Sequence, residues 1–350
     1  MNCARLFFSG LLLLHITGCG QPADSVYQQQ LFAFGTLVDI TLYGVKPEPA
    51  RQAIQAVDAM FQQQHHDWHA WQRGQLDSLN QAISEHRSLE TDASIIQLIR
   101  LGQRFERLSH GLFNPAIGHL LKLWGFQQDE PNHAPPDSEE IQKWLQARPS
   151  SLQLRIEGSA VSSDNPAVRL DFGGFAKGYS VARAVELLEN RGFHNLIVNA
   201  GGDLCLRGRH GDRPWRVGIR SPDGEGVLAS LDLEGTHCVF TSGDYERYFE
   251  FNGKRYHHIL DPRSGYPTDG THSVTVLASD ATLADAAATA LFVAGPKEWP
   301  AIARSMGVRN VLLIDTTGGA HMTQALRPLV HFQQEPTTIE TVALDTPKDS

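Results

Sequence analysis

Residues 168–179 read Val-Arg-Leu-Asp-Phe-Gly-Gly-Phe-Ala-Lys-Gly-Tyr, where an apolar strand end runs into glycines and then into an amphipathic helix at about 175–191. A strand that turns through glycines into a helix exposes backbone N–H groups at the helix N-terminus, a natural site for an anion. Lys177, one turn into that helix, is placed to reach a phosphate. The structural alternative is that Asp171 is a plain N-cap and the glycines form a tight turn.

The helix and strand patterns on either side of this stretch predict the fold class. Helical patterns are found at about 49–64, 91–109, 138–147 and 280–293, and the residues from Gln127 to Pro136 form a loop. Short strands are expected near 195–199, 203–207, 215–220, 227–233, 237–241, 246–251, 255–260, 273–278 and 309–314. The segment 32–42 also resembles a strand, and because it has no local partner we expect it to pair with the later strands. The pattern therefore predicts an α+β fold, a single interleaved domain of mixed and antiparallel sheets with flanking helices.

Composition narrows the class of protein without indicating its chemistry. The 350 residues are 41% hydrophobic and 20% charged, which is enough apolar material for a core and excludes disorder of the whole chain. The formal net charge of −9 argues against a protein that binds the nucleic-acid backbone. Four cysteines are too few for a disulfide scaffold.

The first residues resemble the leader of an exported lipoprotein. Arg5 precedes an apolar run, Leu6 to Leu14, that is about half the ~20 residues a membrane span needs, and Thr17-Gly18-Cys19 follows it. An ordinary signal peptide with an incidental Cys19 is the alternative. The resemblance implies a signal peptide at 1–18 and a lipid-anchored (palmitate-bearing) Cys19 on the periplasmic side of a bacterial membrane. Gly at position 20 favours the outer membrane, with the inner membrane possible.

The expected leader also determines where the other segments should begin and implies that the chain works in an oxidising compartment. A lipid anchor and tether would occupy 19–31, the folded domain 32–335 and a C-terminal tail 336–350. No later segment looks membrane-spanning, so contact with the membrane is expected through the anchor alone. In an oxidising compartment Cys205 and Cys238 either pair or are each a buried small apolar residue, and the sequence leaves both open.

Two polar turns between the later strands are ambiguous. Residues 199–203, Asn-Ala-Gly-Gly-Asp, follow an apolar run, and a glycine pair between strands favours a hairpin turn over a ligand site. Thr241, Ser242 and Gly243 end another strand, where small hydroxyl residues suit either close approach of a ligand or a polar turn.

His257 and His258 precede the turn Asp261-Pro262-Arg263-Ser264-Gly265. Neighbouring strand residues face opposite sides, so at most one of these histidines easily faces a shared site. A structural or exposed histidine is the alternative.

The helix near 280–293 is built almost entirely of Ala and aliphatic residues around Asp285 and Thr289. These two lie four positions apart on one face, and the helix is expected to be buried. A buried carboxylate needs a partner or a cation, and a carboxylate with a hydroxyl oxygen suits Mg²⁺. The alternative is a carboxylate bonded to a neighbouring backbone or salt-bridged.

Five blocks in this order resemble the ApbE family of FAD:protein FMN transferases over roughly residues 32–315. The blocks are Asp-Phe-Gly-Gly-Phe-Ala-Lys-Gly (171–178), Asn-Ala-Gly-Gly-Asp (199–203), Thr-Ser-Gly-Asp-Tyr (241–245), His-Ile-Leu-Asp-Pro-Arg-Ser-Gly (258–265) and Ala-Asp-Ala-Ala-Ala-Thr-Ala (284–290). Any one block is weak, but five in register are specific. The resemblance implies an ApbE-type, T-fold-like domain, and the lipoprotein leader fits it, since many relatives are exported and anchored.

The resemblance also implies a set of site residues. Mg²⁺ would be held by Asp285, Thr289 and the backbone carbonyl of Gly174, bridging the pyrophosphate of FAD. His258 would be the general base, with Lys177 beside the reacting groups. The expected FAD contacts are Phe34, Trp71, Leu112, Phe113, Asn114, Asp171, Lys177, Thr241, Ser242, Gly243 and Ile259. Phe34, Trp71 and Asn114 stand where relatives often have Met, Tyr and Asp, and only the last swap changes the hydrogen-bonding chemistry.

The implied reaction attaches FMN from FAD to a threonine or serine hydroxyl of an acceptor flavoprotein and releases AMP. That acceptor would be a subunit of an exported or membrane redox complex. Two other functions remain open on the residues: an FAD pyrophosphatase, in which water replaces the acceptor, and a non-catalytic flavin-binding lipoprotein. No nucleic-acid partner is expected.

Overall fold

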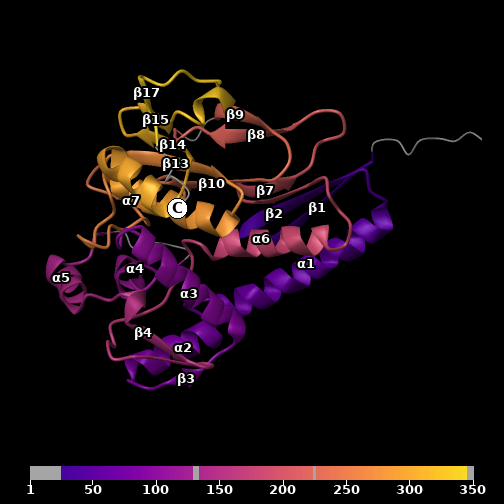
Figure 1. Cartoon of the computed structure of the whole chain (residues 1–350). Coiled ribbons are helices and arrows are strands. Elements are labelled where there is room, and N and C mark those ends of the chain that lie inside the picture. Colours follow the sequence, from indigo (N-terminus) through magenta and orange to yellow (C-terminus); the bar gives the residue numbers. More distant parts are fainter. Residues whose placement is uncertain (1–24, 129–133, 224–225, 345–350) are drawn as a thin grey trace, which may run out of the picture.

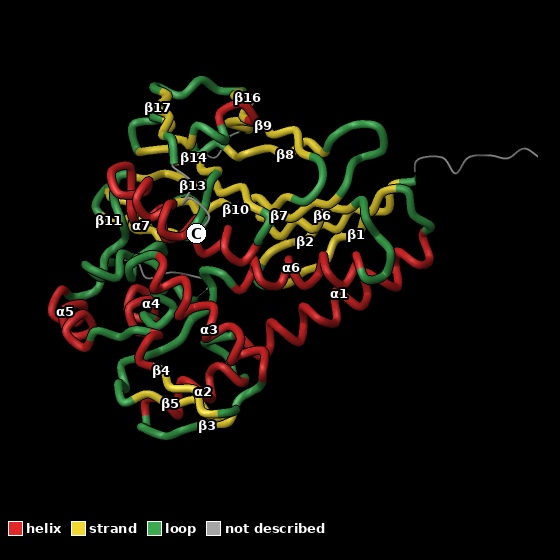
Figure 2. The backbone as a smooth tube through the Cα atoms, in the orientation of Figure 1, coloured by secondary structure: helices red, strands yellow, loops and turns green. Residues whose placement is uncertain are grey.

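The computed structural model describes residues 25–128, 134–223 and 226–344 of the chain, and it has the predicted α+β architecture (Figures 1 and 2). The helices are α1 (Pro47–Trp68), α2 (Gln75–Ser84), α3 (Ala93–Leu108), α4 (Gly118–Trp124), α5 (Ser138–Ala147), α6 (Ala176–Glu189) and α7 (Ala281–Met306), with short 3₁₀ turns at Ser151–Gln153 and Arg327–Leu329. The leader and Cys19 lie outside the described residues.

A nine-stranded sheet organises the molecule, in the order β1-β2-β6-β7-β10-β13-β14-β15-β17. Its strands are β1 (Val26–Ala33), β2 (Thr36–Tyr43), β6 (Leu196–Ala200), β7 (Asp203–Arg207), β10 (His237–Gly243), β13 (Thr271–Ala278), β14 (Asn310–Asp315), β15 (Ala320–Thr323) and β17 (Ile339–Val342). All neighbours are antiparallel except β15 and β17. β2 pairs with β6, with Val38 opposite Ala200, so the early segment does join the later strands as predicted.

Three smaller sheets complete the fold. They are β3 (Leu89–Glu90), β5 (Ala160–Ser163) and β4 (Leu154–Glu157); β8 (Trp215–Arg220), β9 (Val227–Leu233) and β16 (Val330–Phe332); and β11 (Tyr248–Phe251) with β12 (Lys254–His257).

The large sheet is covered on both faces by apolar packing. Helices α1, α6 and α7 contact one face, where the largest buried cluster includes Ile40, Val198, Phe240 and Leu291. Sheet β8-β9-β16 packs on the other face around Leu206, Trp215 and Leu231. Figure 1 shows this layering, with α6 and α7 on one side of β7, β10 and β13 and the strands β8 and β9 on the other.

The single strand predicted over 32–42 is wrong, because the chain reverses within it. Phe34 and Gly35 form a two-residue turn with φ of 53° and 72°, and β1 and β2 pair with Phe32 opposite Leu37. A two-residue hairpin turn of type I′, as here, needs positive φ at both central positions, for which Asn-Gly is the usual signal. Here a phenylalanine occupies the first of them, so the sequence lacks the usual marker.

Two predicted boundaries also need correction, because the ranges expected to be tether and tail each contain a strand of the large sheet. β1 begins at Val26, inside the range 19–31. β17 lies inside the range 336–350 and pairs in parallel with β15, with His321 opposite Glu340. The folded unit of the described chain therefore extends beyond 32–335 at both ends.

Cys205 and Cys238 form a disulfide between β7 and β10, in which they are directly opposite. Both are buried. The structure thus selects pairing from the two possibilities that the sequence leaves open. Among the described helices, none combines the length and apolar character that crossing a bilayer requires.

Candidate active site

A half-buried lysine and two buried carboxylates lie together where α6, α7 and the β6–β7 turn meet. Lys177, in the first turn of α6, forms an ion pair with Asp203, the first residue of β7. Burial disfavours the ammonium form, but the carboxylates of Asp203 and Asp285 outweigh it and raise the pKa of Lys177. Lys177 therefore carries a permanent positive charge, balanced by carboxylates from two other elements.

Close approach of α6 to α7 places Asp285 in this cluster. The backbone N–H of Gly178 donates to Asp285 Oδ2 at 2.7 Å. A Cβ at residue 178 would lie 2.5 Å from the carbonyl oxygen of Ala281 and 2.7 Å from Asp285 Cβ, so only glycine fits this crossing. Burial, with the carboxylate of Asp203 nearby, raises the pKa of Asp285 above its usual range, against the opposing influence of Lys177.

Thr289 lies one helical turn beyond Asp285 and faces two other predicted site residues. Its hydroxyl is 3.2 Å from Ser242 Oγ at the end of β10. A Cβ built on Gly174 would lie 3.8 Å from Thr289 Oγ1 and 3.0 Å from the ring of Phe113. The structure thus brings Gly174, Thr289 and Ser242 together beside Asp285, from three elements.

The donor set fits Mg²⁺ by its chemistry. A carboxylate, a hydroxyl and a backbone carbonyl are hard oxygen ligands, and Mg²⁺ takes few such ligands from a protein when it also binds substrate phosphates. The described residues contain no group of three or more His, Cys, Asp or Glu side chains that could hold a metal by themselves. Asp285 is the one predicted ligand with an ionisable side chain, and among the described residues the bond from Gly178 N is the only hydrogen bond to its carboxylate.

Asp203 and the turn before it have a double role. Gly201 and Gly202 form the hairpin turn between β6 and β7, as the structural alternative predicts. Asp203 itself also accepts a hydrogen bond from Thr241 N at 2.7 Å, so it links β10 to Lys177. We did not predict Asp203 as a site residue. The feature of the sequence that could have identified Asp203 is a carboxylate directly after the glycine pair Gly201-Gly202.

The tip of the β1–β2 hairpin lies beside this turn. Gly201 N donates to Leu37 O at 3.1 Å, and a Cβ on Gly201 would come within 2.5 Å of Thr36 Oγ1. Phe34, at the tip, contacts the rings of Phe61 and His65 at centroid distances of 5.3 and 6.0 Å. The structure therefore places Phe34 two residues from the Thr36–Gly201 contact.

Asp171 is not the N-cap of α6; that position is Phe175, and its side chain makes no capping bond. Asp171 Oδ1 accepts from Gly173 N at 2.7 Å, which shapes the glycine turn, and Oδ2 accepts from Trp71 Nε1 at 2.8 Å. Two residues predicted to contact FAD, Trp71 and Asp171, are thus in direct contact although they lie 100 positions apart.

The Leu112–Asn114 stretch plays a mainly structural part in the chain itself. Leu112 and Phe113 are buried, and the ring of Phe113 packs against Phe105 and Phe175. The amide of Asn114 donates to Pro149 O and accepts from Ala116 N, both at 2.9 Å. Phe113 lies next to Gly174, whereas the side chain of Asn114 is used in holding its own loop.

The two histidines have different surroundings. β12 ends at His257, earlier than the strand predicted over 255–260, and the buried ring of His257 accepts from Ile259 N and contacts Thr268 O at 2.9 Å. His258 is partly exposed, and its Nδ1 lies 3.3 Å from Arg247 O. Burial of the ring, the guanidinium of Arg247, and His257 lower the pKa of His258 to about 3.

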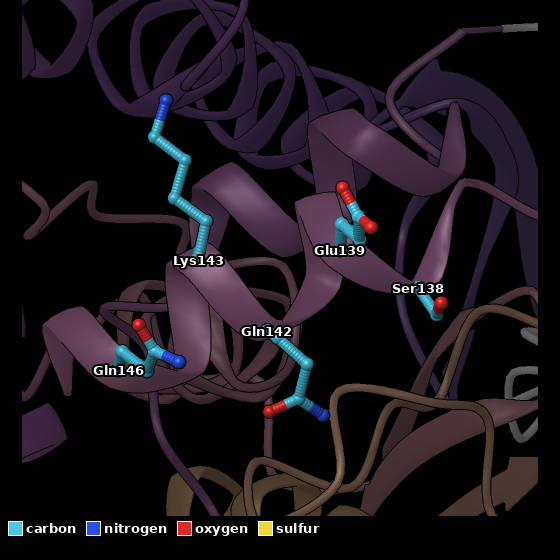
Figure 3. A pocket seen from close by; sticks show the side chains of 5 residues that line it. All are labelled: Ser138, Glu139, Gln142, Lys143 and Gln146. Carbon is cyan, nitrogen blue, oxygen red and sulfur yellow. The ribbon is translucent and has the colours of Figure 1, made fainter.

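Two hollows in the described surface lie away from this cluster. One, of about 320 Å³, lies on α5 and is lined by Ser138, Glu139, Gln142, Lys143 and Gln146 (Figure 3). The other, of about 840 Å³, lies between the segments 66–78 and 89–92. Neither is lined by a predicted site residue.

An α+β fold that gathers a half-buried lysine, carboxylates, hydroxyls and glycine turns at one place has the makings of an active site. The chain belongs to the ApbE family, whose sequence pattern matches residues 34–312. The resemblance inferred from the five blocks is thereby confirmed.

The relatives and the solved structures agree. The chain is 41% identical over 328 residues to an FAD:protein FMN transferase of Rhodobacter capsulatus; the match covers 94% of this chain and 62% of that longer protein. A protein of the same name from Vibrio cholerae is 30% identical over 88% of this chain and 92% of its own length. The ApbE protein of Thermotoga maritima superposes with a TM-score of 0.78 at 34% identity, covering 87% of this chain and 99% of that one. The flavin transferase ApbE of Vibrio cholerae does so with a TM-score of 0.77 at 26% identity, over the same shares.

Proposed function

We propose that this protein is an FAD:protein FMN transferase that attaches FMN to a threonine or serine hydroxyl of an acceptor flavoprotein and releases AMP. The observation that carries the proposal is the cluster of Lys177, Asp203 and Asp285 at the glycine turn into α6. It offers a fixed cation to a pyrophosphate and a carboxylate to the metal ion that would accompany it, which is what phosphoryl transfer requires. The names of the relatives support the same reaction.

FAD is held by residues around this cluster. Trp71 and Phe34 supply aromatic surface for its rings, and Lys177 supplies a charge for its phosphates. The polar groups at Asp171 and at Thr241–Gly243 border the same region. The other residues proposed to contact FAD are Leu112, Phe113, Asn114 and Ile259. Asn114 contributes mainly by supporting this part of the FAD site, because its amide is engaged with Pro149 and Ala116.

His258 accepts the proton of the attacking hydroxyl. Its Nδ1–H donates to Arg247 O, so the lone pair lies on Nε2. The acceptor oxygen forms a bond to the FMN phosphorus, the bond from that phosphorus to the AMP oxygen breaks, and the hydroxyl proton passes to Nε2. The lowered pKa of His258 keeps the imidazole neutral at neutral pH, so the lone pair on Nε2 is free to accept the proton.

Gly174, Asp285 and Thr289 hold Mg²⁺ in this proposal. When bound, the ion neutralises negative charge on the pyrophosphate. The closeness of Gly174 to Thr289, together with the single hydrogen bond of Asp285, supports this assignment.

One incubation tests the reaction. The protein is mixed with FAD and Mg²⁺, with and without a candidate exported flavoprotein, and AMP release and acceptor mass are followed. Gain of one FMN by the acceptor, lost when Mg²⁺ is chelated, is the expected result. AMP and free FMN with no mass gain on any acceptor would make the protein a pyrophosphatase, and absence of AMP would overturn the proposal.

We also propose that the chain is exported and anchored by a lipid at Cys19 on the periplasmic side of the membrane. The Leu6–Leu14 run and the Thr17-Gly18-Cys19 sequence support this, and the Cys205–Cys238 disulfide suits an oxidising compartment. Labelled palmitate should enter the full chain but not a Cys19→Ala variant. Equal labelling of both would remove Cys19 as the anchor.

A further inference from the structure

The indole of Trp71 is held in one orientation by two residues of the extended segment before α6. Its Nε1–H donates to Asp171 Oδ2 at 2.8 Å, and the guanidinium of Arg169 lies over its ring, 4.5 Å from the centroid. Residues two apart in an extended segment face the same side, which explains how Arg169 and Asp171 grip one ring. The ring remains partly exposed, and among the described residues no other aromatic ring contacts it.

Arg169 is itself fixed on both its backbone and its side chain. Its backbone N–H donates to Ala116 O at 3.2 Å, and its C=O accepts from Gly118 N at 2.9 Å. These two bonds hold the backbone of Arg169 against residues 116–118. The guanidinium donates to Ala70 O at 2.8 Å and lies 3.4 Å from a carboxylate oxygen of Asp77. The side chain is 17% exposed, so its charge is only partly screened by solvent.

We infer that Arg169 is a positioning residue for FAD, which holds Trp71 as a preformed platform for one of the planar rings of FAD. The inference rests on the proposed function and names a residue outside the predicted contacts. By bonding Ala70 O, Arg169 fixes the residue before Trp71, and by stacking on the indole it fixes the ring. A platform ordered before FAD arrives avoids the entropy cost of ordering it on binding.

If Arg169 positions Trp71, its replacement should weaken the binding of FAD without slowing the chemical step. Arg169→Met keeps the aliphatic stem but removes the cation and the bond to Ala70 O. We expect the Kd and the KM for FAD to rise about tenfold, the size of a partly desolvated cation–π contact, with kcat at saturating FAD changed less than about twofold. Arg169→Lys retains a cation but not the planar fork, so we expect a rise of about threefold.

A double-mutant cycle separates positioning from general support of the fold. In a Trp71→Ala background, Arg169→Met should raise the Kd for FAD by less than about twofold, because the ring it holds is gone. Arg309→Gln, at an exposed position, is the matched control and should leave Kd and kcat unchanged.

FAD binding is measured by titration calorimetry, and turnover by AMP release. An unchanged Kd in Arg169→Met, or an equal loss in the Trp71→Ala background, would overturn the inference while wild-type turnover upholds the proposed function. If Arg169→Met does not fold, an unchanged Kd in Arg169→Lys has the same meaning. A wild-type chain that binds no FAD would overturn both.

Discussion

His258 has two ring nitrogens in different situations, and this asymmetry suits it to accept a proton. Nδ1 is engaged by the carbonyl of Arg247, which leaves Nε2 as the basic atom. Because burial and the nearby guanidinium lower the pKa of His258 to about 3, the neutral imidazole persists well below pH 7. The ring is thus a weak base that is available at every physiological pH.

This leads to a prediction about pH. The kcat/KM for FAD reports the ionisation of the free enzyme, so its acid limb due to His258 should lie below pH 5 rather than near 6.5. A profile of kcat/KM from pH 4.5 to 8 measures it. His258→Ala should lower kcat by about 100-fold or more while FAD binding is retained. An acid limb near pH 6.5 that disappears in His258→Ala would contradict the lowered pKa.

Asp285 gives a second prediction at this scale. Asp285→Asn keeps an oxygen for the Gly178 N–H but removes the ionisable group on which the proposed Mg²⁺ site depends. We expect kcat to fall by about 100-fold or more, and the rise in Tm caused by Mg²⁺ to disappear. Thermal unfolding with and without Mg²⁺ measures the second effect. Asp164→Asn, whose side chain is 80% exposed, is the control; a normal Mg²⁺ response in Asp285→Asn would refute the assignment.

Among the elements, the crossing of α6 and α7 controls the distance between Lys177 and Asp285. In Gly178→Ala the new methyl group would meet the backbone of Ala281, which cannot move aside cheaply. We expect a loss of about 1–3 kcal/mol in the free energy of unfolding and a drop in turnover, as α6 is displaced from α7. Denaturant titration and AMP release measure the two.

Gly218→Ala is the matched control for this prediction. A Cβ there would lie 3.5 Å from the side chain of Val227, an ordinary contact, and residue 218 is in β8, away from the cluster. Stability close to that of the wild type is expected in this variant. If Gly178→Ala were equally harmless, the close crossing would not be needed for the site.

The elements that could be predicted from the sequence are those with a strong apolar period. The helix predicted at 138–147 matches α5, and the strands at 203–207, 215–220 and 227–233 match β7, β8 and β9. The helix α4 was missed because its seven residues show too little periodicity, and α2 was missed although α5, also of ten residues, was predicted. In β1 a Gln-Gln-Gln run separates Val26 and Tyr27 from the apolar residues at its end, so the apolar signal is interrupted.

The candidate site was predictable to a similar extent and for a similar reason. The turn into α6 and the pair on α7 carry local signals, glycines before a helix and a lone carboxylate among alanines. The ion pair of Lys177 with Asp203 and the bond of Trp71 to Asp171 depend on contacts between distant segments. No local pattern marks such contacts, so only the fold reveals them.

At the scale of the whole molecule, the large sheet holds these distant segments together. The β1–β2 turn, the β6–β7 turn and the end of β10 approach each other because β2, β6, β7 and β10 are neighbours in it. The disulfide joins β7 and β10 within three residues of both Asp203 and Thr241. The site is therefore a product of strand order, and the opposite edge of the sheet contributes stability rather than contacts.

That opposite edge is formed by β17, which gives the last prediction. Deleting residues 336–350 removes the ladder between β15 and β17, the ion pair of Glu340 with His321 and the packing of Val342 and Leu344 on the core. We expect the free energy of unfolding to fall by about 1–3 kcal/mol, since a few partly exposed hydrogen bonds and the packing of two half-buried apolar side chains are lost. The KM for FAD should not change, because the site lies near the other strands.

A chain ending at residue 344 keeps β17 and should match the wild type in both measurements. A raised KM for FAD in the shorter chain alone would show that the C-terminal edge supports the site directly, and equal stability of the two chains would show that β17 contributes nothing to the sheet.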